Sequence, residues 1–313
     1  MKNKKLKFAY LLFAIGIFVA CNNAQKEEKN YDTPVEGDMI LVADESLQPI
    51  VEAQVQGYEM AYPKTKIHVK FVPEQKAINL MLNDSARVAI VTRELNEKEL
   101  EVFKVTEIPY TPAIMALDGV ALICNKNNAD TMITVKELTE MFNGNLKKDT
   151  KLVFDNSSSS NLNYMIKKLG IKDVKKANIF AAKGNKDVIE YVKNNTNAIG
   201  IIGANWISDL DDKKSKNFQN SIRVLSVADK ENPKKTDFYK PNQLTLAERK
   251  YPFERRVYLH TKEARWGLGK GFIRYCCFQV GQLIVEKMGL LPYYKFPRDI
   301  EIVRKPQAVV EKK

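Results

Sequence analysis

The sequence predicts an α/β fold in which strands and helices alternate along the chain. Short apolar or alternating segments, such as Met39–Ala43 and Lys66–Val72, have the pattern of strands. Between them lie segments whose apolar residues recur at helical spacing, several of them introduced by N-cap residues. Strands and helices that alternate with short loops are typical of a parallel sheet covered by helices.

The first block of predicted elements precedes Asp118. In order, it comprises a strand Met39–Ala43, a helix over the apolar positions Leu47 to Tyr58, a strand Lys66–Val72, a helix Glu74–Asn83, a strand Arg87–Val91 and a helix begun by a capping box of Asn96 and Glu99. Apolar and charged residues alternate in the second strand, so His68 is expected to face solvent.

The second block follows the same logic. It comprises a strand Gly119–Cys124, a helix from a capping box of Thr134 and Glu137 to Phe142, a strand Leu152–Phe154, a helix that follows Ser157–Ser160 and stops at Gly170, a helix Asp187–Asn194, strands Ala198–Ile202, Ile222–Ser226 and Arg255–His260, and one long helix Gly269–Met288. The polar segments 211–220 and 228–242 are expected to be loops.

The N-terminal twenty residues have the pattern of a signal peptide. Four lysines precede an apolar run, 8–20, which is too short for a membrane span of roughly 20 residues. The run ends at Ala20-Cys21 and resembles the lipobox of bacterial lipoproteins, in which the cysteine carries the lipids. We therefore expect residues 1–20 to be removed, Cys21 to be lipidated and residues 21–37 to form the anchor and a flexible tether. An ordinary signal peptide with an accidental cysteine is the alternative.

Composition excludes several classes of protein. Hydrophobic residues make up 44% and charged residues 28%, as in folded globular proteins. The formal net charge of +12 is spread along the chain without basic clusters interleaved with aromatics, so no nucleic-acid partner is expected. Two histidines and no C-x-x-C make a zinc site unexpected, and the cysteines after Cys21 are expected to be small buried apolar residues. Neither a Gly-x-Ser-x-Gly elbow nor a P-loop nor a dinucleotide fingerprint occurs, so we expect no enzyme and no cofactor.

Seven separated segments resemble one known family in their order and spacing. They are residues 43–50, 118–125, 134–144, 197–203, 251–258, 271–275 and 281–292. The last two, Gly-Phe-Ile-Arg-Tyr and Gly-Gln-Leu-Ile-Val-Glu-Lys-Met-Gly-Leu-Leu-Pro, are the most specific. They are similar to the closing helix of the phosphate-binding subunit of phosphate ABC importers, within the type II periplasmic binding proteins. The resemblance covers roughly residues 38–303.

The resemblance implies a two-lobed α/β architecture. Each lobe would be a mixed sheet flanked by helices, and the ligand cleft would lie at the hinge. The chain would cross between lobes near Asp118 and return near Pro252. The implied division gives lobe one as 38–117 plus 253–305, lobe two as 118–252 and a charged tail as 306–313.

Three turns could supply the donors that a dehydrated oxyanion needs, because helix N-termini present free N–H groups and a favourable dipole. The first turn contains Ser46 and Leu47, and the second contains Glu74. The third, Ser157, Ser158, Ser159 and Ser160, stands where the family has a Gly-Ser-Gly-Thr-like phosphate loop, so hydroxyl donors are kept and the glycines are lost. A polar loop with an N-cap is the alternative for the serine run.

Two further candidates follow the strand Arg87–Val91. Thr92 stands where the family has an acidic or hydroxyl residue, and Arg93 could offer a bidentate guanidinium to an oxyanion. The alternative for Arg93 is a surface pair with Glu94 or Glu97. The arginine that the family has just before the serine-rich turn is absent, since Phe154 lies nearest.

Glu74 stands where the family has a phosphate-contacting serine. A carboxylate facing an anion is unfavourable unless a proton lies between them, and hydrogen phosphate carries such a proton whereas sulfate does not. Glu74 is therefore expected to favour phosphate over sulfate. The alternatives are that Glu74 merely caps its helix or that the ligand is not phosphate.

The sequence thus predicts a lipid-anchored, monomeric solute receptor of the cell envelope, facing the periplasm. Its partners would be inorganic phosphate or a related oxyanion and the permease subunits of an ABC importer, with the membrane contacted only through the lipid. Gln25–Glu28 looks like a short surface-export signal, which leaves surface exposure open. The alternative is a non-transport lipoprotein of the same fold that acts as a sensor or surface interaction module.

Overall fold

The computed structural model describes residues 32–145, 150–174 and 178–296, which belong to one unit of the chain. The strands in these ranges are β1 Gly37–Asp44, β2 Thr65–Val72, β3 Val88–Val91, β4 Ala113–Asn125, β5 Met132–Thr134, β6 Lys151–Phe154, β7 Ile179–Ala181, β8 Ala198–Gly203, β9 Ile222–Val224, β10 Ser226–Ala228, β11 Glu254–Thr261 and β12 Leu291–Pro292. The predicted signal peptide, Cys21, most of the tether and the charged tail lie outside the described residues.

The helices alternate with these strands, as expected. They are α2 Gln48–Ala61, α3 Glu74–Leu82, α4 Glu97–Val105, α5 Val135–Phe142, α6 Ser160–Leu169, α7 Asn185–Asn194, α8 Lys213–Ser221, α9 Gln243–Ala247, α10 Leu268–Cys277 and α11 Gln279–Lys287, with 3-10 turns η1 Glu45–Leu47, η3 Ala204–Trp206 and η4 Lys235–Asp237. No helix in the described ranges is long and apolar enough to span a membrane.

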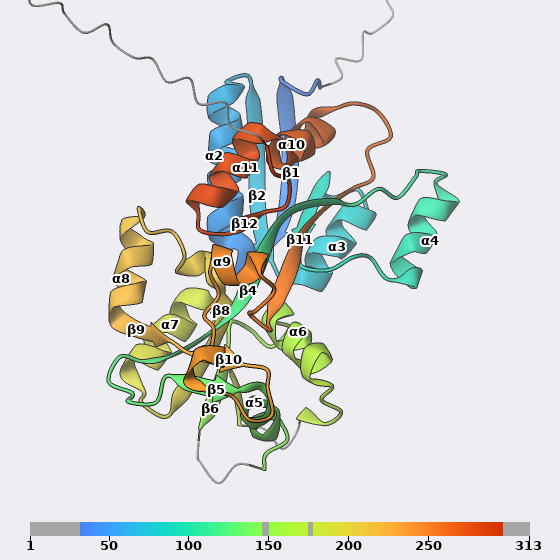
Figure 1. The fold of residues 1–313 in the computed structure, drawn as a ribbon. Coiled ribbons are helices and arrows are strands. Elements are labelled where there is room, and N and C mark those ends of the chain that lie inside the picture. The colour runs from blue at the N-terminus through green and yellow to red at the C-terminus, as the bar shows by residue number, and fades with distance from the viewer. Residues whose placement is uncertain (1–31, 146–149, 175–177, 297–313) are drawn as a thin grey trace, which may run out of the picture. The chain divides into compact units, whose positions relative to one another are not determined.

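Ten of the described strands form one sheet in the order β2-β1-β3-β11-β4-β8-β6-β7, with β9 and β12 paired to β4 (Figure 1). The sheet is mixed, because β1 is parallel to β2 and β3 whereas β11 runs antiparallel to β3 and β4. Strands β5 and β10 make a separate parallel pair. The predicted α/β class with mixed sheets is confirmed.

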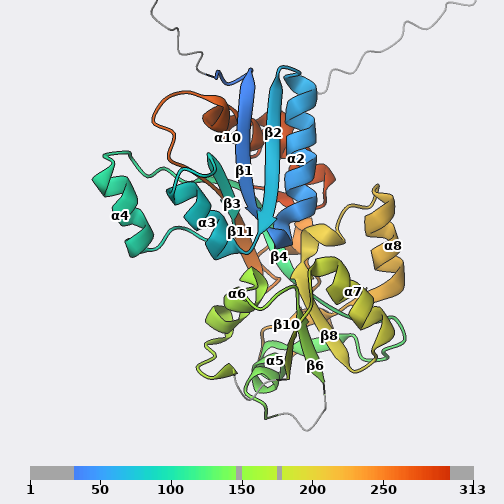
Figure 2. The same ribbon diagram turned by 180° about the vertical axis from the view of Figure 1, so that it is seen from behind.

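Strand β4 passes from one half of the sheet to the other. Its residues 113–119 pair with β11, and its residues 120–125 pair with β8 and β9. We call β1, β2, β3, β11 and β12 with α2, α3, α4, α10 and α11 the first lobe, and β5 to β10 with α5 to α9 the second lobe (Figures 1 and 2). The lobe boundaries drawn from the sequence stay predictions; they fall inside β4 and one residue from the start of β11.

Each lobe buries apolar side chains on both faces of its sheet. In β1, Leu41 and Ala43 pack with α2 and α10, whereas Val42 faces α3. In β4, Val120 and Leu122 pack with residues of α5 and α6, and the alternate positions face α7. Burial on both faces fixes the register of these strands, and with it the place where each strand ends.

Local signals of the sequence are found where they were expected. The capping boxes at Asn96 and Thr134 are both formed, and Gly170 ends α6 in the left-handed conformation at φ 64°. His68 is exposed on β2, and its Nε2 lies 3.0 Å from an Asp38 oxygen. Cys124 and Cys276 are buried, whereas Cys277 is half-buried.

The segment 211–220, expected to be a loop, contains α8, so that expectation is wrong. Asp212 caps this helix by accepting from the Ser215 amide at 2.8 Å, and Phe218 is the apolar side chain that packs on the second lobe. A single apolar residue gives no periodicity, so the pattern could not reveal the helix.

The long helix expected over 269–288 is broken into α10 and α11 at Phe278, whose backbone is extended. The Gln282 side chain donates to the Cys276 carbonyl at 2.7 Å and to the Met115 carbonyl at 2.9 Å. Gly281 lies so close to the end of α10 that a Cβ there would stand 2.3 Å from the Tyr275 carbonyl oxygen. The side-chain amide therefore binds carbonyls at the end of α10, and the chain turns.

Candidate functional site

The candidate site lies where the carboxyl ends of strands from both lobes meet. Asp44 ends β1, Thr92 follows β3 and Asp155 follows β6. Parallel strands bring their carboxyl ends to one edge of a sheet, which is where open α/β folds place ligands. The hydrophobic cores of the two lobes therefore fix the positions of the short loops that follow these strands.

The Asp44 carboxylate joins the two lobes. Its Oδ1 accepts from the Ser46 amide at 3.0 Å, from the Ser46 hydroxyl and from the Ser160 hydroxyl at 2.8 Å. The two serine oxygens lie 3.2 Å apart. Ser46 belongs to the turn before α2 and Ser160 begins α6, so the structure brings these two predicted residues together from opposite lobes. All three side chains are buried.

Arg255 of β11 completes what we call the interlobe cluster, namely Asp44, Ser46, Ser160, Asp118 and Arg255. Its Nε and Nη2 donate to Asp118 Oδ2 at 3.1 and 2.8 Å, and Nη2 also donates to Ser46 Oγ at 3.1 Å. Burial alone would lower the pKa of Arg255, but the charges of Asp118 and Asp44 offset this and raise it. The guanidinium therefore stays charged beside the serine hydroxyls.

Sequence reasoning missed Arg255 as a site residue. The signal was its alternation with apolar residues: Phe253, just before β11, and Arg255 and Val257 within it are all buried and therefore share the inward face. Asp118 lies directly opposite Arg255 in the β4 register. A charged residue at an inward position of an apolar strand needs a partner, and Asp118 is the charge that the neighbouring strand offers.

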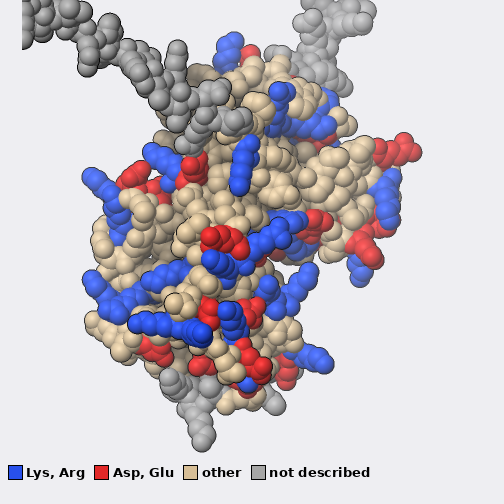
Figure 3. All heavy atoms as spheres, in the orientation of Figure 1, with Lys and Arg blue, Asp and Glu red and all other residues tan. Residues whose placement is uncertain are grey.

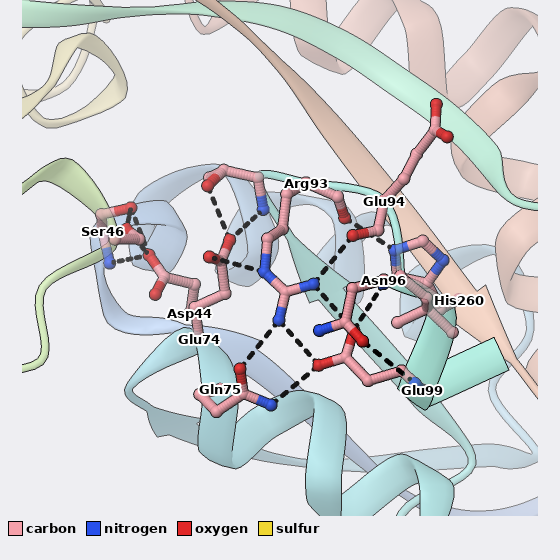
Figure 4. Close-up of polar contacts among 12 residues, drawn as sticks. Asp44, Ser46, Glu74, Gln75, Arg93, Glu94, Asn96, Glu99 and His260 are labelled. Carbon is pink, nitrogen blue, oxygen red and sulfur yellow. Dashed lines mark hydrogen bonds and ion pairs between the residues drawn. The ribbon is translucent and has the colours of Figure 1, made fainter. Parts of the chain in front are cut away.

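A second group surrounds Glu74, Thr92 and Arg93, and Figure 4 shows it beside Asp44 and Ser46. Glu74 Oε1 accepts from the Thr92 amide at 2.7 Å and from the Thr92 hydroxyl at 2.6 Å. Burial, followed by the charge of Asp44, raises the pKa of Glu74, although the Thr92 hydrogen bonds and Arg93 act in the opposite direction. Glu74 is therefore a buried acid with a strengthened hold on a proton.

The Arg93 guanidinium is occupied by protein acceptors (Figure 4). Nη1 and Nη2 each donate to one Glu99 oxygen at 2.8 Å, and the other contacts are the Glu94 carbonyl, Gln75 Oε1 and, from Nε, Glu74 Oε2 at 3.5 Å. Burial raises the pKa of Glu99, but the hydrogen bonds from Arg93, Gln75 and the Asn96 amide, together with the charge of Arg93, more than offset this and bring the pKa to about 2. A direct role for Arg93 in holding an oxyanion would require it to leave Glu99.

The remaining predicted residues take different places. Leu47 is fully buried in the core of the first lobe, so only its backbone can face the site. Ser159 caps α6 by accepting from the Leu162 amide at 3.2 Å, and its hydroxyl donates to Asp155. Ser157 and Ser158 are exposed and do not join the interlobe cluster.

Further hydrogen bonds cross between the lobes at the same turn. Two side chains of η3 donate to the Ser46 carbonyl: Asn205 through its side-chain Nδ2 at 2.8 Å, and Trp206 through its indole Nε1 at 3.0 Å. The Asn156 side chain donates to Glu45 Oε2 at 2.9 Å. These contacts fix the Ser46 turn against the second lobe.

The charge balance of the site is acidic. Burial, and then the charge of Asp44, raises the pKa of Asp155 to about 6. Asp44, Glu74 and Asp118 add further carboxyl groups around Arg255. The cluster offers an anion hydroxyl, amide and guanidinium donors, and it offers a protonated anion several acceptors. On the face of the described residues that Figure 3 shows, Lys and Arg side chains are spread over both lobes and are mixed with Asp and Glu side chains.

The described residues contain no group of three or more His, Cys, Asp and Glu side chains arranged to hold a metal ion. Of the polar atoms nearby, Asn161 Nδ2 and Asp118 Oδ1 are buried without a hydrogen-bond partner. A buried polar atom without a hydrogen-bond partner is unfavourable in a protein interior, and a bound polar ligand could supply that hydrogen bond.

Comparisons with known proteins agree with this architecture. A family model described as PBP superfamily domain matches residues 25–277. The chain is 22% identical over 309 residues to the Phosphate-binding protein PstS of Borreliella burgdorferi, which covers 92% of this chain and 98% of that protein. Like the other curated relatives found, that protein is named for binding and not for catalysis.

Two solved structures share the fold. A phosphate ABC transporter substrate-binding protein from Clostridium perfringens, crystallised with phosphate, matches with a TM-score of 0.69 at 19% identity, over 82% of this chain and 100% of that one. An ABC-type phosphate transport receptor from Vibrio cholerae matches with a TM-score of 0.60 at 18% identity, over 81% and 99%. At these identities the likeness establishes the type II binding-protein fold.

Proposed function

The chain belongs to the PBP superfamily, and from that membership and the interlobe cluster we propose that it is a solute-binding protein that captures inorganic phosphate for an ABC importer. The observation that carries the proposal is the convergence of donors from both lobes on one point. The Ser46 amide and hydroxyl, the Ser160 hydroxyl and the Arg255 guanidinium lie within hydrogen-bond distance of one another or of one carboxylate oxygen. Such a set of donors suits an oxyanion.

Phosphate is favoured over a fully deprotonated oxyanion by the carboxyl groups of the site. Glu74 and Asp155 are both buried, and the pKa of each is raised. In its ionised form such a carboxyl group is a strong acceptor for the proton of hydrogen phosphate, whereas sulfate at neutral pH has no proton to donate. The names of the curated relatives, which are phosphate-binding proteins, point the same way.

The placement in the cell is part of the proposal. Cys21, after a basic start and a short apolar run, would be lipidated and would hold the protein on the cell envelope facing the periplasm, by lipid and tether alone. A monomer bound to phosphate would then deliver it to the permease subunits of the importer. Closure and opening of the two lobes would accompany capture and release.

Calorimetric titration of the ligand-stripped full chain with phosphate, and separately with sulfate, tests the proposal. We expect saturable heat with phosphate at one site per chain and none with sulfate. The control is Arg255→Lys, which keeps the charge but loses the fork that reaches Asp118 and Ser46 together. A folded, ligand-free protein that gives no heat with phosphate would contradict the proposal.

One observation favours a second function. Arg93 is paired with Glu99, and the Ser46 and Ser160 hydroxyls of the interlobe cluster already donate to Asp44. A lipoprotein of this fold that senses or binds another protein, or a receptor for another oxyanion, would retain the architecture without phosphate binding. A folded protein that gives no binding heat with phosphate would favour these alternatives.

A further inference from the structure

We propose that Asp44 is a built-in competitor for the ligand: its carboxylate occupies the oxyanion position of the interlobe cluster and links the two lobes. The inference rests on the proposed function, because it concerns the same donors. It assigns Asp44 a role in setting affinity that none of the predicted ligand contacts has.

The contacts of Asp44 exceed what a helix cap needs. As the residue before η1, it accepts from the Ser46 amide, which is ordinary capping. The Ser160 hydroxyl, however, comes from the second lobe and reaches the same oxygen at 2.8 Å. Capping explains the first bond and leaves the second, which spans 116 residues of chain, without a reason.

The position of Oδ1 is the position that a ligand oxygen would need. Ser46 Oγ and Ser160 Oγ lie 3.2 Å apart and both donate to Oδ1. An oxygen of phosphate bound by the same two hydroxyls would have to stand where Oδ1 stands. The side chain of Asp44 must therefore withdraw, or the hydroxyls must turn away from it, before the oxyanion can bind.

The charge of Asp44 acts throughout the site. After burial, which is the larger cause, it raises the pKa of Glu45, Glu74 and Asp155, and after Asp118 it contributes to the raised pKa of Arg255. An incoming oxyanion would meet the same negative charge at shorter range. Removal of that charge should therefore favour the oxyanion, even where the acceptor atom remains.

Asp44→Asn tests the inference, since it keeps the size of the side chain and an acceptor oxygen but removes the charge. We expect phosphate to bind Asp44→Asn at least tenfold more tightly than wild type in calorimetric titration of the full chain. The matched control is Glu45→Gln, which removes the neighbouring carboxylate. Glu45 also bridges the lobes, through Asn156, but does not touch the two serine hydroxyls. This variant should change the affinity less than threefold.

The outcomes separate the inference from the function on which it rests. Tighter binding by Asp44→Asn, or binding by that variant where wild type is silent, supports the competitor. Equal affinity in wild type and Asp44→Asn, or loss of binding in the variant, overturns it while phosphate binding stands. If wild type and both variants are folded and none gives binding heat with phosphate, the proposed function is overturned, and with it the inference that Asp44 competes with the ligand. If Asp44→Asn does not fold, Asp44→Ser takes its place under the same criteria.

Discussion

Arg255 and Asp118 form an ion pair whose side chains are 1% and 0% exposed. Each of the two charges depends on the other, because either one alone would be buried in an interior that solvates it poorly. At the residue scale the candidate site is therefore also a point on which folding depends. A change here must be tested for stability before any loss of binding is interpreted.

Replacing Arg255 by Met should lower the free energy of unfolding by about 3–5 kcal/mol, since Asp118 then stays buried without its partner. Urea unfolding followed by circular dichroism measures the change. Arg256→Met is the control, because Arg256 lies next in the same strand with an exposed side chain and should shift stability by no more than about 0.5 kcal/mol. Equal effects of the two changes would contradict a buried, paired Arg255.

Asp155 makes stability depend on pH. Its pKa rises from an ordinary 3.8 to about 6 in the folded protein, so the folded state binds the proton more tightly than the unfolded state does. The stabilisation is complete below 3.8 and is lost as the pH rises through 6. Between pH 7 and pH 5 the wild type should therefore gain about 1 kcal/mol relative to Asp155→Asn. Denaturant unfolding at both pH values measures this, and parallel pH profiles for the two proteins would refute it.

At the scale of the element, the parts that could be predicted were those with a local cause. Capping boxes at Asn96 and Thr134 and the left-handed Gly170 act within a few residues, so the sequence around them predicts where those helices begin or end. The break at Phe278 has a distant cause. The Gln282 amide reaches the carbonyl of Met115 on β4, and no pattern within 269–288 could predict that contact.

The site follows the same division. Ser46 and Ser160 could be predicted, because Ser46 lies in the turn before α2 and Ser160 is the first residue of α6. Arg255 could not be assigned to the site by its own neighbours, since its place beside Ser46 depends on the register of β11 against β4. The pairing of Arg93 with Glu99 was missed for a related reason, because Glu99 also belongs to the capping box of α4 and turns toward Arg93 from there.

At the scale of the whole molecule, the two lobes are held by a small number of close contacts around Ser46. Gly203, at the end of β8 in the second lobe, is one of them. A Cβ there would lie 2.7 Å from Arg255 Nη2 and 2.8 Å from the Ser46 carbonyl oxygen, both of which belong to the first lobe. Its backbone, at φ −67° and ψ 137°, suits any residue, so close approach and not conformation requires a glycine.

Gly203→Ala should therefore push the lobes apart, since the Arg255 guanidinium is held by Asp118, Asn161 and Ser46 and a backbone carbonyl cannot move aside as a free side chain can. We expect a larger radius of gyration by small-angle X-ray scattering and, if the cluster binds phosphate, at least a tenfold loss of affinity. Gly200→Ala is the matched control three residues earlier, because its Cβ would crowd Val188, Ile123 and Val192 at 2.7–2.8 Å, all inside the second lobe. It should cost about 1–3 kcal/mol of stability and leave the scattering unchanged. Wild-type scattering and affinity in Gly203→Ala would mean that the lobes tolerate the added methyl group, and that contact at Ser46 does not set their separation.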